Sequence, residues 1–159
     1  MPEWRHTLTV DASFDNTHGV TGIGIIIQER GPGRGRGPVL DRISESHFGV
    51  SPGAAEEFAV LRALEIAIER GFTRVKVRSD YNSMRRKLRG RLRQKRLKGD
   101  GLRGRILQLT SAFEWLDFGL VARRKNQEAH RLARQACTGR SGGRDSLTES
   151  STLDGEIAP

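Results

Sequence analysis

The chain has 159 residues, of which 35% are hydrophobic and 30% are charged, and this suits one compact, strongly polar domain. No apolar run has the length of a membrane span, the N-terminus lacks the apolar core of a signal peptide, and Cys137 is the only cysteine, so we expect a cytoplasmic protein without an intramolecular disulfide or a membrane partner. The formal net charge of +9 is clustered, which indicates a polyanionic partner such as nucleic acid; a solvated surface is the simpler alternative.

The first fifty residues have the patterns of β-strands. Residues 6–14, 21–29 and 39–50 are rich in alternating or β-branched side chains, and a turn rich in Gly and Pro separates the last two. Gly22 and Gly24 lie inside the second strand, where we expect them to allow close approach of another backbone segment. The short connections favour an antiparallel meander.

The hydrophobic period then changes from that of strands to that of helices. Residues 51–71 predict a helix that Ser51 caps, that has Pro52 at its first position and that ends at Gly71. The remaining elements follow in order: a strand at 74–80, one or two helices within 81–116, a strand at 117–124, and a helix at 125–136 capped by Asn126. From Thr138 onward the composition predicts a disordered tail, so residues 1–137 form the expected domain and 138–159 the tail.

Acidic residues stand at the edges of three of these elements. Asp11 lies inside the first strand, where aspartate is depleted, and Asp80 ends the fourth strand. Glu56 and Glu57 lie in the first turn of the first long helix, a position that the helix dipole also favours. If the first and fourth strands are neighbours and the helix packs on them, these acids converge. Clustered carboxylates repel one another unless a cation neutralises them, and hard divalent cations prefer oxygen ligands.

Four stretches resemble the type 1 ribonuclease H family, especially its compact bacterial and archaeal branch. In chain order they are "LTVDASFDNTHGVTGIGIII", "AAEEFAVLRALEIAIERG", "VKVRSDYNSMRRKLRG" and "VARRKNQEAHRLARQA". The resemblance implies an α/β, ribonuclease H-like fold: a mixed five-stranded sheet, with three antiparallel strands before the strand–helix units, flanked by helices. It also implies an endoribonuclease that uses two divalent metal ions, Mg²⁺ or Mn²⁺, to hydrolyse the RNA strand of RNA–DNA hybrids. We expect a monomer.

The resemblance also assigns the metal site. Carried over to this chain, the catalytic and metal-binding residues are Asp11, Glu56, Asp80 and His130. Helical phase does not separate Glu56 from Glu57; the family register selects Glu56, and Glu57 remains the alternative. The family usually has aspartate in place of His130, and a neutral imidazole can bind a metal but removes one negative charge.

The competing interpretation takes His130 as an ordinary histidine at the edge of the core, with a backbone hydrogen bond. The chain would then be a non-catalytic nucleic-acid-binding module on the same fold. A weaker alternative is a cationic, ribosome-associated protein without a site.

A basic segment is the predicted substrate grip. From Arg85 to Arg105 it has eleven Lys or Arg residues and one acid, Asp100, so it would hold phosphates without reading sequence. The family's basic protrusion lies in the same region. The predicted nucleic-acid-binding residues are Asn82, Arg85, Arg86, Lys87, Arg89 and Arg123. Asn82 equally suits an ordinary helix cap, and we expect Trp4 and Trp115 to be packing residues.

Overall fold

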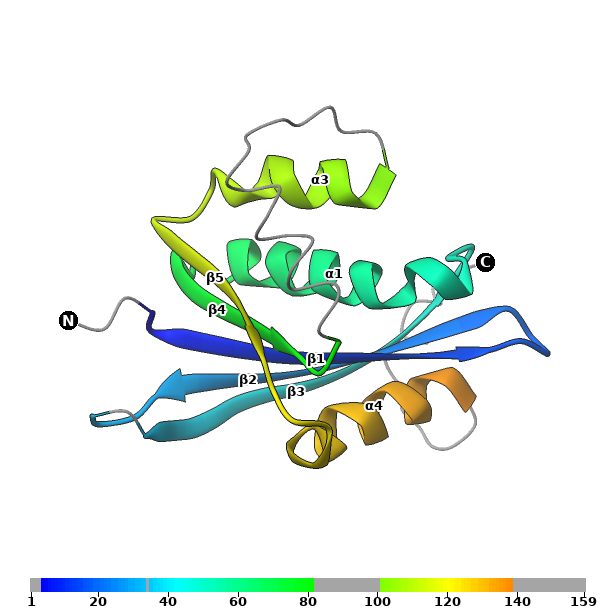
Figure 1. Ribbon diagram of the computed structural model, residues 1–159, viewed down its shortest axis with the longest axis horizontal. Coiled ribbons are helices and arrows are strands. Elements are labelled where there is room, and N and C mark those ends of the chain that lie inside the picture. Colours follow the sequence, from blue (N-terminus) through cyan, green and yellow to red (C-terminus); the bar gives the residue numbers. More distant parts are fainter. Residues whose placement is uncertain (1–3, 34, 82–100, 139–159) are drawn as a thin grey trace, which may run out of the picture.

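The computed structural model describes residues 4–33, 35–81 and 101–138. Its five-stranded sheet has the order β3-β2-β1-β4-β5 (Figure 1). The strands are β1 (His6–Asp15), β2 (Val20–Arg30), β3 (Arg36–Phe48), β4 (Arg74–Ser79) and β5 (Trp115–Leu120). The β1–β2 and β2–β3 pairs are antiparallel, whereas β4 is parallel to both β1 and β5. The predicted α/β fold with a mixed five-stranded sheet is confirmed.

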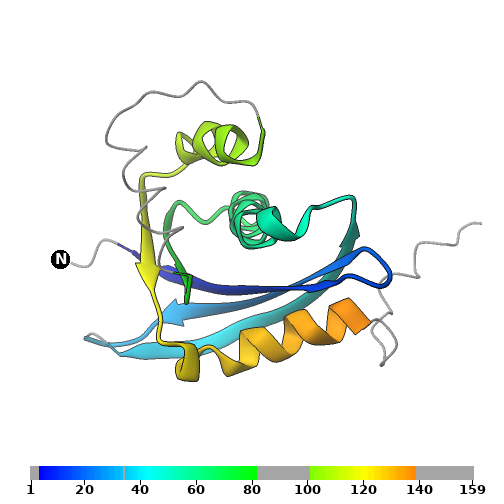
Figure 2. The same ribbon diagram turned by 45° about the vertical axis from the view of Figure 1, so that its right-hand side comes forward.

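The sheet separates two layers of helices. Helices α1 (Ala55–Glu69) and α3 (Gly101–Thr110) lie on one face, and α4 (Gln127–Thr138) lies on the other (Figures 1 and 2). Alternation along the strands builds both interfaces. Leu8 and Val10 of β1 are fully buried in the core with Leu64 of α1, whereas Ile26 of β2 packs with Leu132 of α4. Asp11 therefore follows a core residue and points to the α4 side of the sheet.

The boundaries of two predicted elements are wrong. A short 3-10 helix, η1 (Pro52–Ala54), precedes α1, and the Ser51 side chain makes no capping hydrogen bond. Strand β5 ends at Leu120 and a second 3-10 helix, η2 (Arg123–Lys125), follows, where the strand was expected to continue to residue 124. Gly71 does follow α1 with a φ of 76°, a conformation that glycine adopts without strain.

The two glycines in β2 allow α4 to lie directly on the sheet, as predicted. A Cβ atom at Gly24 would lie 2.1 Å from the carbonyl oxygen of Ala129, and one at Gly22 would lie 2.0 Å from that of Ala133. Two hydroxyl groups of β3 hold the same helix: Ser44 Oγ donates to the Leu132 carbonyl at 2.7 Å, and Ser46 Oγ to that of Ala136. The backbone of α4 is therefore fixed close to β2.

Asn126 does not cap α4 with its side chain, contrary to the prediction. Its Nδ2 donates a hydrogen bond of 3.2 Å to the carbonyl of Val10, and its Oδ1 is buried without a hydrogen-bond partner among the residues that the structure describes. The amide thus joins the start of α4 to β1 at the residue before Asp11. The long-range contact wins because the side chain is almost fully buried between the helix and the sheet.

Several predictions concern residues outside the described ranges. The structure does not describe the predicted tail beyond Thr138 or five of the predicted nucleic-acid-binding residues, Asn82, Arg85, Arg86, Lys87 and Arg89.

Trp4 and Trp115 do pack, with ring centroids 5.9 Å apart in a stacked arrangement. Within the described ranges, every helix is too short or too polar to cross a membrane.

Candidate active site

A pocket of about 300 Å³ brings together all four residues of the predicted metal site. It is lined by Asp11, Ala12, Glu56, Asp80, Tyr81, Arg123, Gln127 and His130. The topology explains the convergence: β1 and β4 are parallel neighbours, the first turn of α1 begins beside them, and α4 crosses β1 from the other face. Glu57 is not among the lining residues. Its carboxylate instead accepts a hydrogen bond from Arg103 Nε on α3.

His130 is paired with Asp11, from which it is separated by 119 positions in the sequence. The His130 Nδ1 atom lies 2.7 Å from Asp11 Oδ2. The Asp11 side chain is 6% exposed and that of His130 is 50% exposed, so the ring covers the acid from the solvent side. Burial raises the pKa of Asp11, the hydrogen bond from His130 lowers it, and the charge of Asp80 raises it, with a net increase. The imidazole thus faces a carboxylate rather than the backbone group of the simpler interpretation.

Glu56 is the most perturbed acid of the pocket. Burial, followed by the charges of Asp11 and Asp80, raises the pKa of Glu56 to about 8. Its Oε1 atom is buried and has no hydrogen-bond partner in the described part of the protein. The arginine that lines the pocket is Arg123, whose Nε lies 3.9 Å from Asp80 Oδ2 and whose side chain is 88% exposed. The pocket therefore holds more acidic groups than nearby positive charges that could neutralise them.

The donor set fits a hard divalent cation. Three carboxylates and one imidazole meet in the pocket, and the unpartnered oxygen of Glu56 is a free acceptor. Among residues 4–33, 35–81 and 101–138, no three acidic, histidine or cysteine side chains are already arranged around a common point as metal ligands. The carboxyl group of Asp11 is turned to His130. The fit therefore rests on the chemistry of the donors and on their unneutralised charge.

The raised pKa of Glu56 predicts that this residue destabilises the fold as pH rises. In the unfolded chain the carboxyl ionises near its ordinary value of 4.5, whereas in the fold it ionises near 8. The folded state therefore holds the extra proton between these values, and stability falls with increasing pH across this window. At about 1.4 kcal/mol per pKa unit, the full difference is as much as roughly 4 to 5 kcal/mol.

Glu56→Gln should remove this penalty. In metal-free buffer, its gain in unfolding free energy should be small near pH 5 and should grow to several kcal/mol near pH 9, on the scale of about 1.4 kcal/mol per pKa unit. Urea denaturation at three pH values measures this, with Glu57→Gln, whose carboxylate lies outside the pocket and pairs with Arg103, as the matched control. A gain that does not change with pH would contradict the assigned environment of Glu56.

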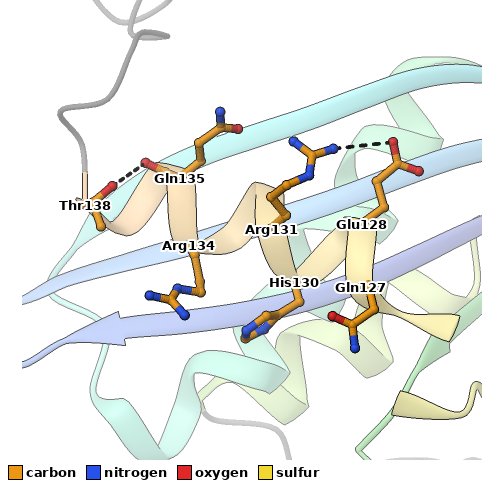
Figure 3. Close-up of a pocket in the computed structure, with 7 residues that line it drawn as sticks. All are labelled: Gln127, Glu128, His130, Arg131, Arg134, Gln135 and Thr138. Atoms are coloured by element: carbon orange, nitrogen blue, oxygen red, sulfur yellow. Dashed lines mark hydrogen bonds and ion pairs between the residues drawn. The ribbon is translucent and has the colours of Figure 1, made fainter. Parts of the chain in front are cut away.

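An open hollow of about 790 Å³ continues from the pocket along α4. Gln127 and His130 line both spaces. Figure 3 shows Gln127, His130 and Arg134 on one side of the helix, whereas Arg131 and Glu128 lie on the other, where they form an ion pair of 3.8 Å. Gln127 and Arg134 were not among the site residues expected from the sequence, although they lie next to the site. Their spacing of three and four residues from His130, which places them on one helix face, was the available signal.

The strand order and the placement of the helices define a ribonuclease H-like fold. A model of the family described as "Reverse transcriptase-like" matches residues 9–136, and the chain belongs to this family. No curated protein sequence matches the chain at a significant level.

Solved structures with this fold include three ribonucleases H. Ribonuclease H1 from the halophilic archaeon Halobacterium salinarum is 22% identical, with a TM-score of 0.67, over 84% of this chain and 98% of that one. The N-terminal ribonuclease H domain of rv2228c from Mycobacterium tuberculosis is 21% identical, with a TM-score of 0.65, over 91% and 96%. LC11-RNase H1, isolated from compost by a metagenomic approach and solved with an RNA/DNA hybrid, is 22% identical, with a TM-score of 0.64, over 84% and 97%. The resemblance to ribonucleases H that the sequence suggested is confirmed, and the likeness is one of fold.

Proposed function

We propose that the protein is a metal-dependent endoribonuclease that hydrolyses the RNA strand of RNA–DNA hybrids. The observation that carries this proposal is the convergence of Asp11, Glu56, Asp80 and His130 in one pocket. These four residues come from β1, α1, the end of β4 and α4. A fold that needed only stability would gain nothing from two carboxyl groups that raise the pKa of a third. A structural neighbour bound to an RNA/DNA hybrid supports the choice of substrate.

The four pocket residues would hold two divalent cations, Mg²⁺ or Mn²⁺. When bound, such cations supply an activated water and offset the charge that develops on the leaving 3′ oxygen. The resemblance to ribonucleases H implies that Asp11 would contribute to holding both ions. Arg123 stands at the pocket edge with an exposed guanidinium, which suits a contact to the phosphate next to the scissile bond.

Binding of the duplex would rest mainly on phosphate contacts. Arg85, Arg86, Lys87 and Arg89 carry the densest positive charge of the sequence, and Asn82 stands just ahead of them. Such contacts position a duplex without reading its sequence. The 2′-hydroxyl group marks the RNA strand and is the feature that a hybrid-specific site has to recognise.

The direct experiment is cleavage of a labelled RNA–DNA hybrid with Mg²⁺, with Mn²⁺ and with a chelator. We expect internal cuts in the RNA strand only when a divalent ion is present. Single-stranded RNA and double-stranded DNA of the same sequence are the controls. Metal-independent binding without any cleavage would instead support the non-catalytic module, for which the existing Asp11–His130 pair is the favourable observation.

His130 should set the choice of metal. With an imidazole in place of a fourth carboxylate, the site has less negative charge for Mg²⁺, whereas Mn²⁺ accepts nitrogen ligands more readily. We expect higher activity with Mn²⁺ in the parent protein, a shift towards Mg²⁺ in His130→Asp, and a lower rate in His130→Ala. Metal titrations of hybrid cleavage for the three proteins measure this. If His130→Ala keeps the parental rate and metal affinity, His130 forms a hydrogen bond with Asp11 but does not contribute to the metal site.

A further inference from the structure

Among the described helices, none covers β4 and β5 on the side of the sheet where α4 packs (Figures 1 and 2). Helix α4 contacts β1, β2 and β3, and Figures 1 and 2 show β4, β5 and the hairpin between β2 and β3 extending beyond it. Four basic side chains occupy this region, which we call the open sheet face. They are Arg30 of β2, Arg36 of β3, and Lys76 and Arg78 of β4.

The register places these four side chains on the same face. Val75 and Val77 of β4 are buried in the core with α1, so Lys76 and Arg78, which alternate with them, point to the opposite side. Gln28 is opposite Val39, which packs against the α4 cluster, and the β2–β3 register shifts between Gln28 and Arg30. Beyond this irregularity Arg30 and Arg36 are cross-strand partners, and Arg30 lies over the same Trp4 ring as Lys76, which places both on one face. The open sheet face is therefore continuous with the surface on which α4 lies.

Packing holds the basic side chains in place. Arg30 Cζ lies 4.7 Å, and Lys76 Nζ 4.8 Å, from the centre of the Trp4 ring, which itself stacks on Trp115. A Cβ atom at Gly119 of β5 would lie 2.7 Å from Lys76 Cε and 3.4 Å from Arg78 Cγ. Because Gly119 has no side chain, the aliphatic parts of Lys76 and Arg78 can lie across β5 at this position. Ordered cations lose less conformational entropy on binding a ligand than freely rotating ones.

In the described part of the chain, most of the positive charge of the open sheet face is not offset by ion pairs. The exception is Arg74, which precedes Lys76 by two residues on β4 and whose Nη1 lies 3.6 Å from Glu114 Oε1. Within the described residues, Arg30, Arg36, Lys76 and Arg78 make no ion pair, whereas Arg42, Arg70 and Arg105 each pair with a glutamate or aspartate. One acid, Asp117, is opposite Lys76 in the β4–β5 register. A bound anion would relieve the repulsion between these cations.

We propose that the open sheet face binds the phosphate backbone of a nucleic-acid strand, at a site separate from the acidic pocket. Three of its four cations are arginines, whose planar guanidinium groups match phosphate oxygens in pairs. The cations are spread over three strands, so an extended polyanion fits better than a single phosphate ion. Arg78 precedes Asp80 by two residues, so one long nucleic acid can contact the open sheet face and the acidic pocket at the same time. Two linked contacts raise its overall affinity above that of either contact alone.

The test is binding without divalent metal, so the result does not depend on whether the protein cleaves RNA. The probe is a fluorescent single-stranded RNA of roughly 20 nucleotides, followed by anisotropy over a range of NaCl concentrations. The triple variant Arg36→Gln/Lys76→Gln/Arg78→Gln should weaken binding at least roughly tenfold. It should also reduce the slope of log K against log salt by about 2, because each lost contact to a single strand contributes about 0.7.

A control variant of equal net charge isolates the site. Arg42→Gln/Arg70→Gln/Arg131→Gln removes three positive charges that are already paired, and its salt slope should stay close to that of the parent. If the triple variant does not fold, Arg36→Gln/Lys76→Gln makes the same test with a slope change of about 1.4. Equal slopes for the two triple variants would overturn the proposal. A second result would also overturn it: the triple variant of the open sheet face loses binding to anionic phospholipid vesicles but still binds RNA like the parent. The open sheet face would then bind a membrane surface.

Discussion

Asp80→Asn and Asp11→Asn should each reduce hybrid cleavage by more than about a hundredfold without unfolding the protein. Even residues that only orient a metal ligand typically contribute roughly 10- to 100-fold, so loss of a ligand itself should cost more. Asparagine keeps the size of the side chain but removes its charge, and at position 11 it can still accept a hydrogen bond from His130. Stability in metal-free buffer should therefore stay level or rise. Single-turnover cleavage and thermal melting, measured on the same samples, give the two readouts.

The neighbouring glutamates of α1 provide a matched control for this prediction. Glu56→Gln should abolish cleavage like the aspartate variants, whereas Glu57→Gln should leave the rate within about threefold of the parent. The two changes are chemically identical and one residue apart, yet Glu56 lines the pocket and Glu57 pairs with Arg103. If Asp11→Asn or Asp80→Asn keeps a near-normal rate, the pocket is not the catalytic site. If Glu57→Gln is the inactive variant, the register of α1 in the metal site is wrong.

Local patterns in the sequence were sufficient for most of the fold. Alternating side chains located β1, β2 and β3, because one face of each strand meets an apolar core. Gly24 indicated a close backbone contact, which α4 makes. The boundaries near Ser51 and after Leu120 were less accurate. Short 3-10 helices follow the geometry of the chain's entry into and exit from the sheet, which residue preferences encode weakly.

The site depends on contacts that the sequence pattern does not contain. Helical phase alone left Glu56 and Glu57 equivalent, and only the position of α3, with Arg103 facing Glu57, separates them. The partner of His130 is Asp11, and periodicity has no information about a pair so distant in the chain. Asn126 likewise had the sequence of a helix cap, yet its buried side chain bonds to Val10 on β1. Tertiary burial thus decided all three cases.

Gly24→Ala should be, with Gly22→Ala, among the most damaging small substitutions in the described part of the protein. The added methyl group would lie 2.1 Å from the carbonyl oxygen of Ala129 and 2.8 Å from the backbone nitrogen of Ala133. Both atoms belong to the backbone of α4, so no side-chain rotation relieves the clash and the helix has to move. Overpacking typically costs about 1–3 kcal/mol, and we expect the upper end here. For a chain of this size, that lowers the melting temperature by roughly 6 to 12 °C.

The same substitution should also damage the site, because Gly24 is the cross-strand partner of Asp11. The missing side chain at residue 24 is what lets α4 reach the sheet beside Asp11 and brings His130 Nδ1 within 2.7 Å of its carboxylate. Gly24→Ala should therefore lower cleavage even at temperatures where the variant is folded. Gly53→Ala is the matched control, since a Cβ atom there has no neighbour within 4 Å, and it should change stability by less than about 0.5 kcal/mol. If Gly24→Ala has the same melting temperature and cleavage rate as Gly53→Ala, α4 does not pack directly on Gly24. The position of His130 next to Asp11 would then have another cause.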